Sequence, residues 1–176
     1  AWSQIAIAGP NSRKIISKIV DPDFDISNEK FPFMACADIS ICKGIRARLF
    51  RISFSGELAY ELSVPTQYSC SLISYLMEIG KEENITPYGT EALGVMRIEK
   101  GHAAGPELNG TTSALNLNMD KMVSSKKDSI GMILSKREGL NKIDALKLVG
   151  LKPIKSDTQI ISGSHIFNLK DKIKPE

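Results

Sequence analysis

Residues 51–62 bring together the side chain types that could bind a polar, planar ligand. The segment contains the charged and aromatic residues Arg51, Glu57, Tyr60 and Glu61. From residue 58 to residue 64, apolar residues alternate with polar or small ones, which predicts a strand with one apolar face. Residues 46–54 are its predicted partner strand. Ser55-Gly56 is the predicted turn between them, because glycine readily adopts the positive φ of a tight hairpin.

A second candidate group lies in the helix predicted between Thr90 and Gly101. Thr90 is the predicted N-cap, and Gly101 is the predicted end of the helix. Arg97 flanks the apolar stripe of this helix, where burying an unpaired charge costs several kcal/mol by rough estimate. Arg97 is therefore expected to have a ligand or a carboxylate partner. Glu57 and Glu61 are the two acids weighed for that structural pair.

Composition and charge describe a globular chain of ordinary size. The 176 residues include 42% hydrophobic and 24% charged residues, and the formal net charge is +3. The basic residues are spread along the chain, which does not favour nucleic-acid binding, and mild basicity suits a small anionic ligand. No apolar run approaches the ~20 residues that a membrane-spanning helix needs. We therefore expect a cytoplasmic protein with neither nucleic acid nor membrane as a partner.

The cysteines and histidines do not predict a metal site. Cys36, Cys42 and Cys70 have spacings that match no zinc motif, and His102 and His165 are isolated from each other. We interpret the cysteines as reduced thiols, as expected in a reducing compartment. No metal ligand is assigned.

Strand and helix patterns alternate irregularly along the chain. Helices are predicted at 10–20, 65–79, 90–101 and 128–134, and strands at 5–8, 31–41, 46–54, 58–64, 146–151 and 158–167. A regular strand–helix–strand alternation is missing, which favours an α+β fold over a doubly wound sheet.

Several motifs resemble the folate-dependent aminomethyltransferase family, which includes the T-protein of glycine cleavage. Ser55-Gly56-Glu57-Leu58-Ala59-Tyr60-Glu61-Leu62 resembles the glycine-centred hairpin of that family. Arg97-Ile98-Glu99-Lys100-Gly101 is similar to its arginine–glutamate–glycine helix end, and Ile7-Ala8-Gly9-Pro10 to its glycine–proline motif.

A finer resemblance is to one branch, the alpha subunits of heterotetrameric sarcosine oxidases. It rests on Ile85 to Leu93, Glu99 to His102, Lys126 to Gly131, and Leu148 to Leu151. These motifs occur in the same order as in the branch and cover nearly the whole chain.

The resemblance implies a fold and a domain division. It implies a mixed sheet with flanking helices, with residues 1–145 forming part of a folate-binding domain. Residues 146–176 are expected to begin a truncated C-terminal domain resembling a β-barrel. Both ends of the chain look cut, so we expect a fragment. The catalytic aspartate of the family is expected upstream of Ala1, and the catalytic residue of this chain is therefore unknown.

The resemblance also implies a function in one-carbon metabolism. Sarcosine would be demethylated oxidatively on a beta subunit, and tetrahydrofolate would take up the one-carbon unit at this region. FAD, FMN and NAD are expected elsewhere in a complex with beta, gamma and delta subunits, and the isolated chain is not expected to be active alone. The alternatives are an aminomethyltransferase of glycine cleavage and a noncatalytic scaffold in which Glu57 pairs with Arg97.

Three residues carry the implied folate site. Glu57 matches the acid that hydrogen-bonds the pterin ring, where two carboxylate oxygens can accept from an adjacent amino group and ring N–H. Arg97 matches an arginine that lines the site. Tyr60 is assigned either to a face of the ligand or to the apolar core. Glu61 and Arg51 are weaker candidates, interpreted as structural.

Overall fold

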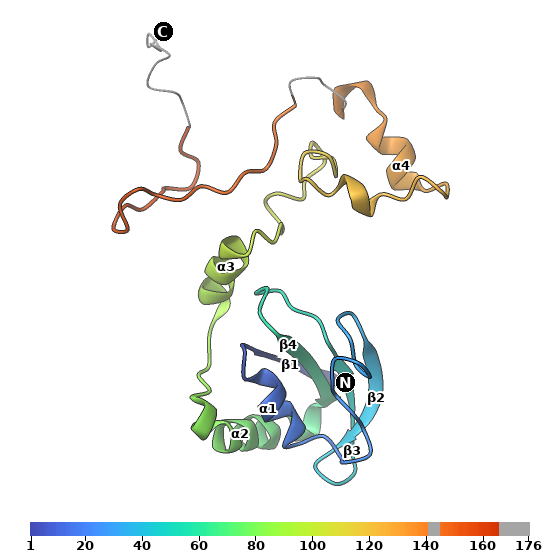
Figure 1. Ribbon diagram of the computed structural model, residues 1–176, viewed down its shortest axis with the longest axis vertical. Helices are drawn as coiled ribbons and strands as arrows, with labels where there is room; N and C mark the ends of the chain where they lie inside the picture. The colour runs from blue at the N-terminus through green and yellow to red at the C-terminus, as the bar shows by residue number, and fades with distance from the viewer. Residues whose placement is uncertain (141–144, 166–176) are drawn as a thin grey trace. The chain divides into compact units, whose positions relative to one another are not determined.

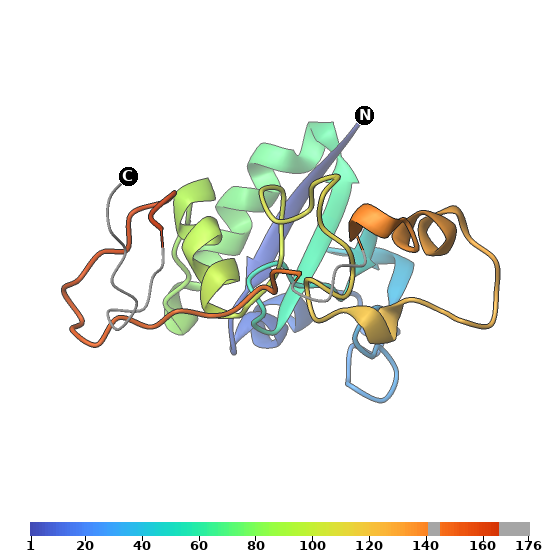
Figure 2. The ribbon, with the colours of Figure 1, turned by 90° about the horizontal axis from the view of Figure 1, so that it is seen from above.

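The structure is a computed structural model that describes residues 1–140 and 145–165. The chain divides into two compact units, Ala1–Asn109 and Gly110–Glu176, which are traced in Figures 1 and 2. The predicted boundary between residues 145 and 146 falls inside the second unit, and that division stays a prediction.

The first unit is built on a four-stranded sheet. Its strands are β1 (Trp2–Ala8), β2 (Cys36–Ile41), β3 (Ile45–Phe50) and β4 (Ala59–Pro65), in the order β1-β4-β3-β2. All three strand pairings are antiparallel (Figure 1). The α+β class is confirmed, but the expected mixed sheet is wrong. Neighbouring strands run in opposite directions throughout the sheet. Between β2 and β3 the chain reverses in the turn at 42–44, where Cys42 and Lys43 adopt positive φ.

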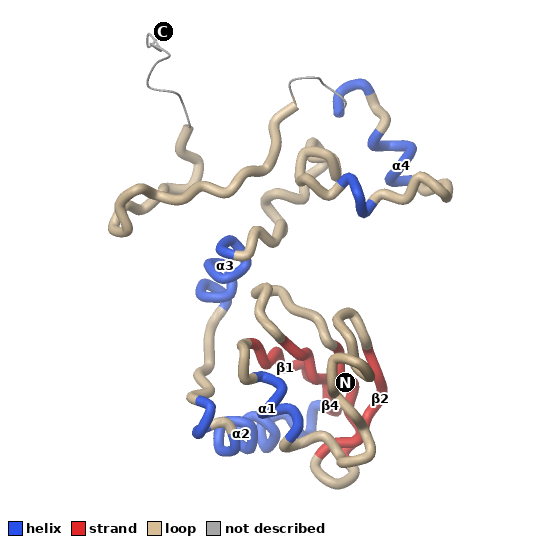
Figure 3. Tube along the Cα trace, in the orientation of Figure 1, coloured by secondary structure: helices blue, strands red, loops and turns tan. Residues whose placement is uncertain are grey.

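One face of the sheet carries the hydrophobic core. The predicted apolar face of β4 is confirmed, because Tyr60, Leu62 and Val64 are fully buried. They join one cluster with residues of α1 (Ser12–Ser17) and α2 (Ser69–Ile79), the two helices that Figure 3 shows beside the sheet. At about 25 cal/mol per Å² of apolar area removed from water, this burial is the main stabilising contribution to the unit.

The two helices keep only part of their predicted apolar stripes. In α1, the predicted burial of Ile15 and Ile16 is confirmed, although the helix begins at Ser12 rather than Pro10. A 3₁₀ turn at Thr66–Tyr68 precedes α2. Leu72 and Leu76 of α2 are buried as predicted, and Met77 is half-buried. Ile73 is exposed, because the narrow stripe that contacts the core runs through Leu72, Leu76 and Ile79.

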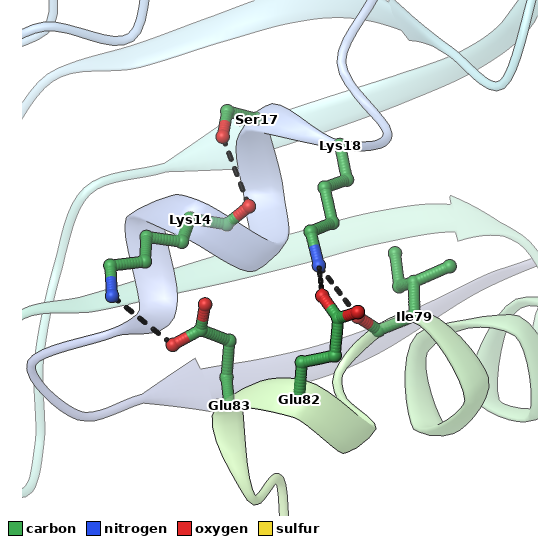
Figure 4. A network of polar contacts seen from close by, with 6 residues as sticks. All are labelled: Lys14, Ser17, Lys18, Ile79, Glu82 and Glu83. Atoms are coloured by element: carbon green, nitrogen blue, oxygen red, sulfur yellow. Dashed lines mark hydrogen bonds and ion pairs between the residues drawn. The ribbon is translucent and has the colours of Figure 1, made fainter.

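Lys14 of α1 and Lys18, which directly follows α1, tie this helix to the end of α2 and to the 3₁₀ turn Lys81–Glu83. Lys14 Nζ lies 3.2 Å from a Glu83 oxygen, and Lys18 Nζ donates to the carbonyl of Ile79 at 2.9 Å (Figure 4). Lys18 also lies 3.5 Å from Glu82. A lysine beside the last carbonyls of a helix satisfies groups that have no partner within the helix.

The connection between β3 and β4 differs from the predicted tight hairpin. The two strands pair as expected, but β3 ends at Phe50, and residues 51–58 form a loop. The Arg51 N–H donates to the carbonyl of Ala35, and its carbonyl accepts from Met34, so the chain leaves β4 at this point. The predicted strand 31–41 is also shorter than expected, since β2 begins only at Cys36, after Met34 adopts a positive φ of 70° that a strand does not accommodate. The positive φ predicted for Gly56 is confirmed at 81°.

The second unit contains short helices. They are the 3₁₀ turns Asp120–Met122 and Glu138–Leu140 and the helix α4 (Ile130–Ser135). The predicted helix 128–134 is thus confirmed with shifted ends, and Ser129 caps α4 by accepting from the Met132 N–H.

The strands predicted at 146–151 and 158–167 are wrong over the described residues, 146–151 and 158–165. Residues 166 and 167 lie outside the described part. Side chain amides of Asn116 and Asn118 donate to the carbonyls of Leu146 and Leu148, so these backbone groups bond to a loop rather than to a strand. Within residues 1–140 and 145–165, no helix is long and apolar enough to cross a membrane.

Candidate ligand-binding site

The loop 51–58 and the C-terminal end of α3 (Thr90–Glu99) lie against each other in the first unit. The ring centroids of Phe54 and His102 are 4.8 Å apart. Glu57, three residues after Phe54, forms an ion pair with Lys100, two residues before His102. Helix α3 begins at Thr90 after Gly89, so the predicted capping by Thr90 is wrong, whereas the predicted end at Gly101 is confirmed by its φ of 70°.

The Glu57 carboxylate is partly exposed to solvent where the loop 51–58 meets the end of α3. Its Oε1 lies 2.6 Å from Lys100 Nζ, and the side chains of Glu57 and Lys100 are 40% and 46% exposed. A pair this exposed contributes little to stability, about 0–1 kcal/mol. A carboxylate offers about four lone-pair sites, so Glu57 can accept hydrogen bonds from a ligand while Lys100 stays in place.

Gly56 is required by both conformation and space. At its φ of 81°, an L side chain is strained, and an added Cβ would lie 2.4 Å from Lys100 Cγ and 2.6 Å from Lys100 Cβ. The methylene stem of Lys100 therefore packs directly on the Gly56 backbone. This close approach places the Lys100 amine next to Glu57.

Replacing Gly56 by alanine should destabilise this contact. We expect Gly56→Ala to lower the free energy of unfolding by about 1–3 kcal/mol, the usual cost of a residue in a sparsely populated backbone region. Gly94→Ala is the matched control, because Gly94 lies in α3 with no atom within 4 Å of an added Cβ. Alanine favours a helix interior, so the control should be neutral or stabilising. Equal effects of the two substitutions in urea unfolding would contradict the assigned packing.

Arg97 has a carboxylate partner, but neither of the predicted acids. Its Nη1 donates to Glu107 Oε2 at 2.9 Å and to the carbonyl of His102 at 3.3 Å. Both side chains of the Arg97–Glu107 pair are mostly buried. The same Glu107 oxygen accepts from the Ala104 N–H at 2.9 Å. Arg97 therefore fastens the segment 101–107 to α3, and the Glu57–Arg97 pair of the scaffold hypothesis is not formed.

These bonds determine how the Glu107 carboxylate affects the stability of the fold at low pH. The hydrogen bond from the Ala104 N–H, together with that from Arg97, lowers the pKa of Glu107 below its usual 4.5. A lowered pKa in the folded state stabilises the fold above pH 4.5, and this contribution is lost as the pH falls through the folded-state value. We expect the Glu107→Gln variant to have a lower free energy of unfolding than the wild type at pH 7. This difference should become progressively smaller as the pH falls below 4.5, because the wild type then loses the contribution of ionised Glu107. Urea unfolding at pH 7 and pH 3 measures this, and a constant difference would contradict it.

Tyr60 lies in the core and not at a ligand surface. Its ring is fully buried, and its hydroxyl accepts from Arg13 Nε at 2.9 Å. Of the two assignments considered from the sequence, the structure places Tyr60 in the one within the apolar core. Glu61 and Arg51 also have structural partners: Glu61 Oε2 accepts from Gln4 Nε2, and Arg51 donates to the Phe31 carbonyl at 2.8 Å.

Sequence reasoning missed Lys100 and Glu107 as parts of this region. Lys100 directly follows the Arg97-Ile98-Glu99 motif, and its charge opposite to that of Glu57 was the available signal. Glu107 comes after a turn that no periodic pattern predicts. Among the described residues, no group of three or more His, Cys, Asp and Glu side chains could hold a metal ion.

Comparison with known proteins assigns the chain to a family. Residues 1–127 match the GCVT N-terminal domain. The chain belongs to the GCVT N-terminal domain family. Within this GCVT family, it is 50% identical over 168 residues to the sarcosine oxidase subunit alpha of Rhizobium meliloti, an alignment that covers 94% of this chain and 17% of that protein. The resemblance to sarcosine oxidase alpha subunits is therefore confirmed.

Other GCVT relatives are more distant. Human mitochondrial dimethylglycine dehydrogenase is 33% identical over 130 residues, covering 72% of this chain and 15% of that protein. The aminomethyltransferase of Halothermothrix orenii is 30% identical over 156 residues, covering 86% of this chain and 41% of that protein. The chain thus spans about a sixth of the sarcosine oxidase subunit it matches.

Proposed function

We propose that this chain supplies a reduced-folate binding surface, and that Glu57 is its principal ligand contact. The observation that carries the proposal is the partly exposed Glu57 carboxylate, presented by the positive-φ Gly56 and backed by Lys100. A pterin ring carries an amino group and a ring N–H side by side, and a carboxylate can accept from both. Charge-assisted hydrogen bonds of this kind are among the stronger ones in proteins.

Arg97 and Lys100 complete the proposed surface in different ways. Lys100 adds positive charge beside Glu57, which suits the carboxylates that folates carry. Arg97 fastens the segment 101–107 through Glu107 and uses only Nη1 in the two bonds described, so its planar fork keeps further donors. In this proposal Arg97 lines the site, and Tyr60 supports it from the core.

The assembly proposed for this surface is of the sarcosine oxidase type, as the 50% identity supports. Tetrahydrofolate bound there would accept the one-carbon unit released when sarcosine is oxidatively demethylated on a beta subunit. The flavin and nicotinamide cofactors, and the beta, gamma and delta subunits, belong to other parts of that proposed complex. No residue of this chain is proposed as the catalytic acid.

An aminomethyltransferase of glycine cleavage is the less supported alternative, since the identity to such an enzyme is 30%. A noncatalytic scaffold was expected to pair Glu57 with Arg97. Those two residues instead bond to Lys100 and Glu107. This arrangement leaves the Glu57 carboxylate available to a ligand.

Calorimetric titration of the full chain with folinic acid tests the proposal. We expect saturable binding, and weaker saturable binding of 6-methyltetrahydropterin, which keeps the pterin ring but lacks the rest of folinic acid. Binding of neither ligand by a folded sample would refute the proposed folate surface.

A further inference from the structure

A groove of about 350 Å³ lies between α2 and the turn that joins β2 to β3. The lining residues that keep some solvent exposure are Cys42, Lys43, Ile45, Tyr68, Ser71 and Tyr75. The buried core residues Ile41, Val64 and Leu72 lie beneath them. Sites for small molecules are typically ~300–1,000 Å³ in volume, with a mostly apolar lining and a few polar groups. The groove therefore has the size and the lining of a small-molecule site.

The groove is separate from the proposed folate surface. It adjoins Ile45, the first residue of β3, whereas the loop 51–58 follows Phe50, the last residue of that strand. At ~3.3 Å per residue, the two ends of β3 lie about 17 Å apart. The described lining includes no residue of the loop 51–58 or of α3. A ligand in the groove would thus not meet Glu57.

The exposed part of the lining favours an aromatic group. The rings of Tyr68 and Tyr75 both border the groove, and aromatic side chains favour a flat ring through offset or edge-to-face contacts. Burial raises the pKa of the Cys42 thiol, and the Asp21 carboxylate raises it further. The thiol is therefore neutral at pH 7 and behaves as a small apolar group. A cavity of ~150 Å³ can enclose benzene, so this groove has room for a ring and a short chain.

Lys43 gives the groove a positive charge at its edge. Among the described residues of the lining, Lys43 alone is charged, and its ammonium group makes no ion pair within residues 1–140 and 145–165. The carboxylate of Asp21 accepts from the backbone N–H of Lys43 at 2.9 Å and is not part of the lining. A lysine offers three donors and no acceptor. The groove therefore favours a ligand whose chain ends in an anion and disfavours a cation.

We propose that the groove between α2 and the turn 42–44 binds an arylalkyl monocarboxylate, an aromatic ring joined by a short chain to a carboxylate. The ring contacts Tyr68, Tyr75 and Ile45, and the carboxylate accepts from Lys43 Nζ. No covalent step is involved. This inference goes beyond the proposed function, because it uses no residue of the folate surface and stands whether or not the chain binds folate.

Protection of Cys42 from alkylation tests the proposal, with 4-phenylbutyrate as the probe. Cys36 and Cys70 are exposed free thiols outside the described lining, so they are internal controls in the same chain. We expect 4-phenylbutyrate to slow the reaction of Cys42 with iodoacetamide in a saturable way and to leave the other two thiols unaffected. Mass spectrometry of each cysteine measures the three rates. An unprotected Cys42, or equal slowing of all three thiols, would overturn the proposal.

Lys43→Met tests the role of the charge. Methionine keeps an unbranched stem at a position whose φ is 65°, so the backbone strain is the same. We expect this variant to bind 4-phenylbutyrate about 2- to 5-fold more weakly, as for a partly exposed ion pair, and to bind the uncharged 4-phenylbutyramide with unchanged affinity. Lys30→Met is the matched control, since Lys30 is exposed and lies outside the described lining. Unchanged 4-phenylbutyrate affinity in Lys43→Met, or an equal loss in Lys30→Met, would overturn the proposal.

Tyr75→Ala tests the aromatic wall. Tyr75 is 45% exposed, so its truncation should leave the chain folded. The variant should bind 4-phenylbutyrate about 2- to 10-fold more weakly, as expected for one lost aromatic contact. Tyr88→Ala, which removes a ring of similar exposure outside the described lining, should retain the affinity. Equal affinities of the two variants would contradict the assigned contact.

The alkylation rate without probe distinguishes a small ligand from a second copy of this chain as the occupant. We expect the rate at Cys42 to be independent of chain concentration. A rate at Cys42 that falls as the chain concentration rises, while the rates at Cys36 and Cys70 stay constant, would mean that a second copy covers the groove. That result would overturn the proposal.

Discussion

Replacing Glu57 by glutamine is expected to weaken folinic acid binding about 10- to 100-fold. The substitution keeps the size of the side chain but removes its charge and replaces one acceptor oxygen by an amide NH₂ group, which donates. Losing a hydrogen bond to a charged group costs roughly 1.5–3 kcal/mol, and each 1.4 kcal/mol is about a tenfold change in Kd. The stability of the chain should change by less than about 1 kcal/mol, because the Glu57–Lys100 pair is exposed. Calorimetry and urea unfolding of the same samples measure both quantities.

Lys100→Met is the matched control for Glu57→Gln. Methionine keeps an unbranched stem that can pack on Gly56, but it cannot pair with Glu57. If Glu57 contacts the ligand directly, Lys100→Met should lose only the few-fold in affinity that the positive charge of Lys100 contributes, clearly less than Glu57→Gln loses. A loss in Lys100→Met as large as that in Glu57→Gln would mean that the ion pair, rather than the Glu57 carboxylate, supports binding. Unchanged affinity in Glu57→Gln would remove Glu57 from the proposed site.

Truncating Tyr60 to alanine should lower the free energy of unfolding by about 3–5 kcal/mol. The ring is fully buried against the cluster that both helices and the sheet form, so its removal leaves a cavity in the core. Tyr60→Phe keeps the ring and removes only the hydroxyl that accepts from Arg13. We expect this variant to lose about 1 kcal/mol. Urea unfolding at pH 7 measures both values.

The two Tyr60 variants also distinguish a core residue from a ligand residue. Tyr60→Phe should bind folinic acid with unchanged affinity, because the hydroxyl points to Arg13 within the first unit. A stability loss below about 1 kcal/mol for Tyr60→Ala would contradict the core assignment. So would a selective loss of folinic acid binding in Tyr60→Phe.

Alternation in the sequence was sufficient to predict the strand at 58–64, because its inward side chains meet a single continuous core. The same reasoning could not predict the loop 51–58. There the Arg51 backbone bonds to residues 34 and 35, which are distant in sequence and carry no pairing signal. The exposure of Ile73 has a similar origin, since the width of the apolar stripe of α2 depends on what packs against it.

In the candidate site, too, the sequence predicts local conformation but not the contacts between residues distant in sequence. The Ser55-Gly56-Glu57 motif locates a turn residue with positive φ, which is a local property, and the structure confirms it. The ion-pair partners depend on how the segment after α3 folds back. Arg97 was expected to have an acid nearby, but its partner is Glu107, brought within reach by the turn at Gly101.

The predicted strands of the second unit were inferred from apolar and β-branched residues alone. A strand also needs a hydrogen-bonding neighbour, and composition does not supply one. In the structure, the N–H of Leu148 donates to the carbonyl of Asn116. Bonds from asparagine side chains take the place of a strand ladder at Leu146 and Leu148.

The most direct test of the central claim, that the loop 51–58 and the end of α3 form a ligand surface, is an amide NMR titration of the full chain with folinic acid. We predict saturable shifts centred on Gly56, Glu57 and Lys100, with smaller shifts toward Arg97. Saturable shifts that leave these residues unaffected would place the ligand elsewhere and contradict the account. An absence of shifts across a folded chain would contradict it as well.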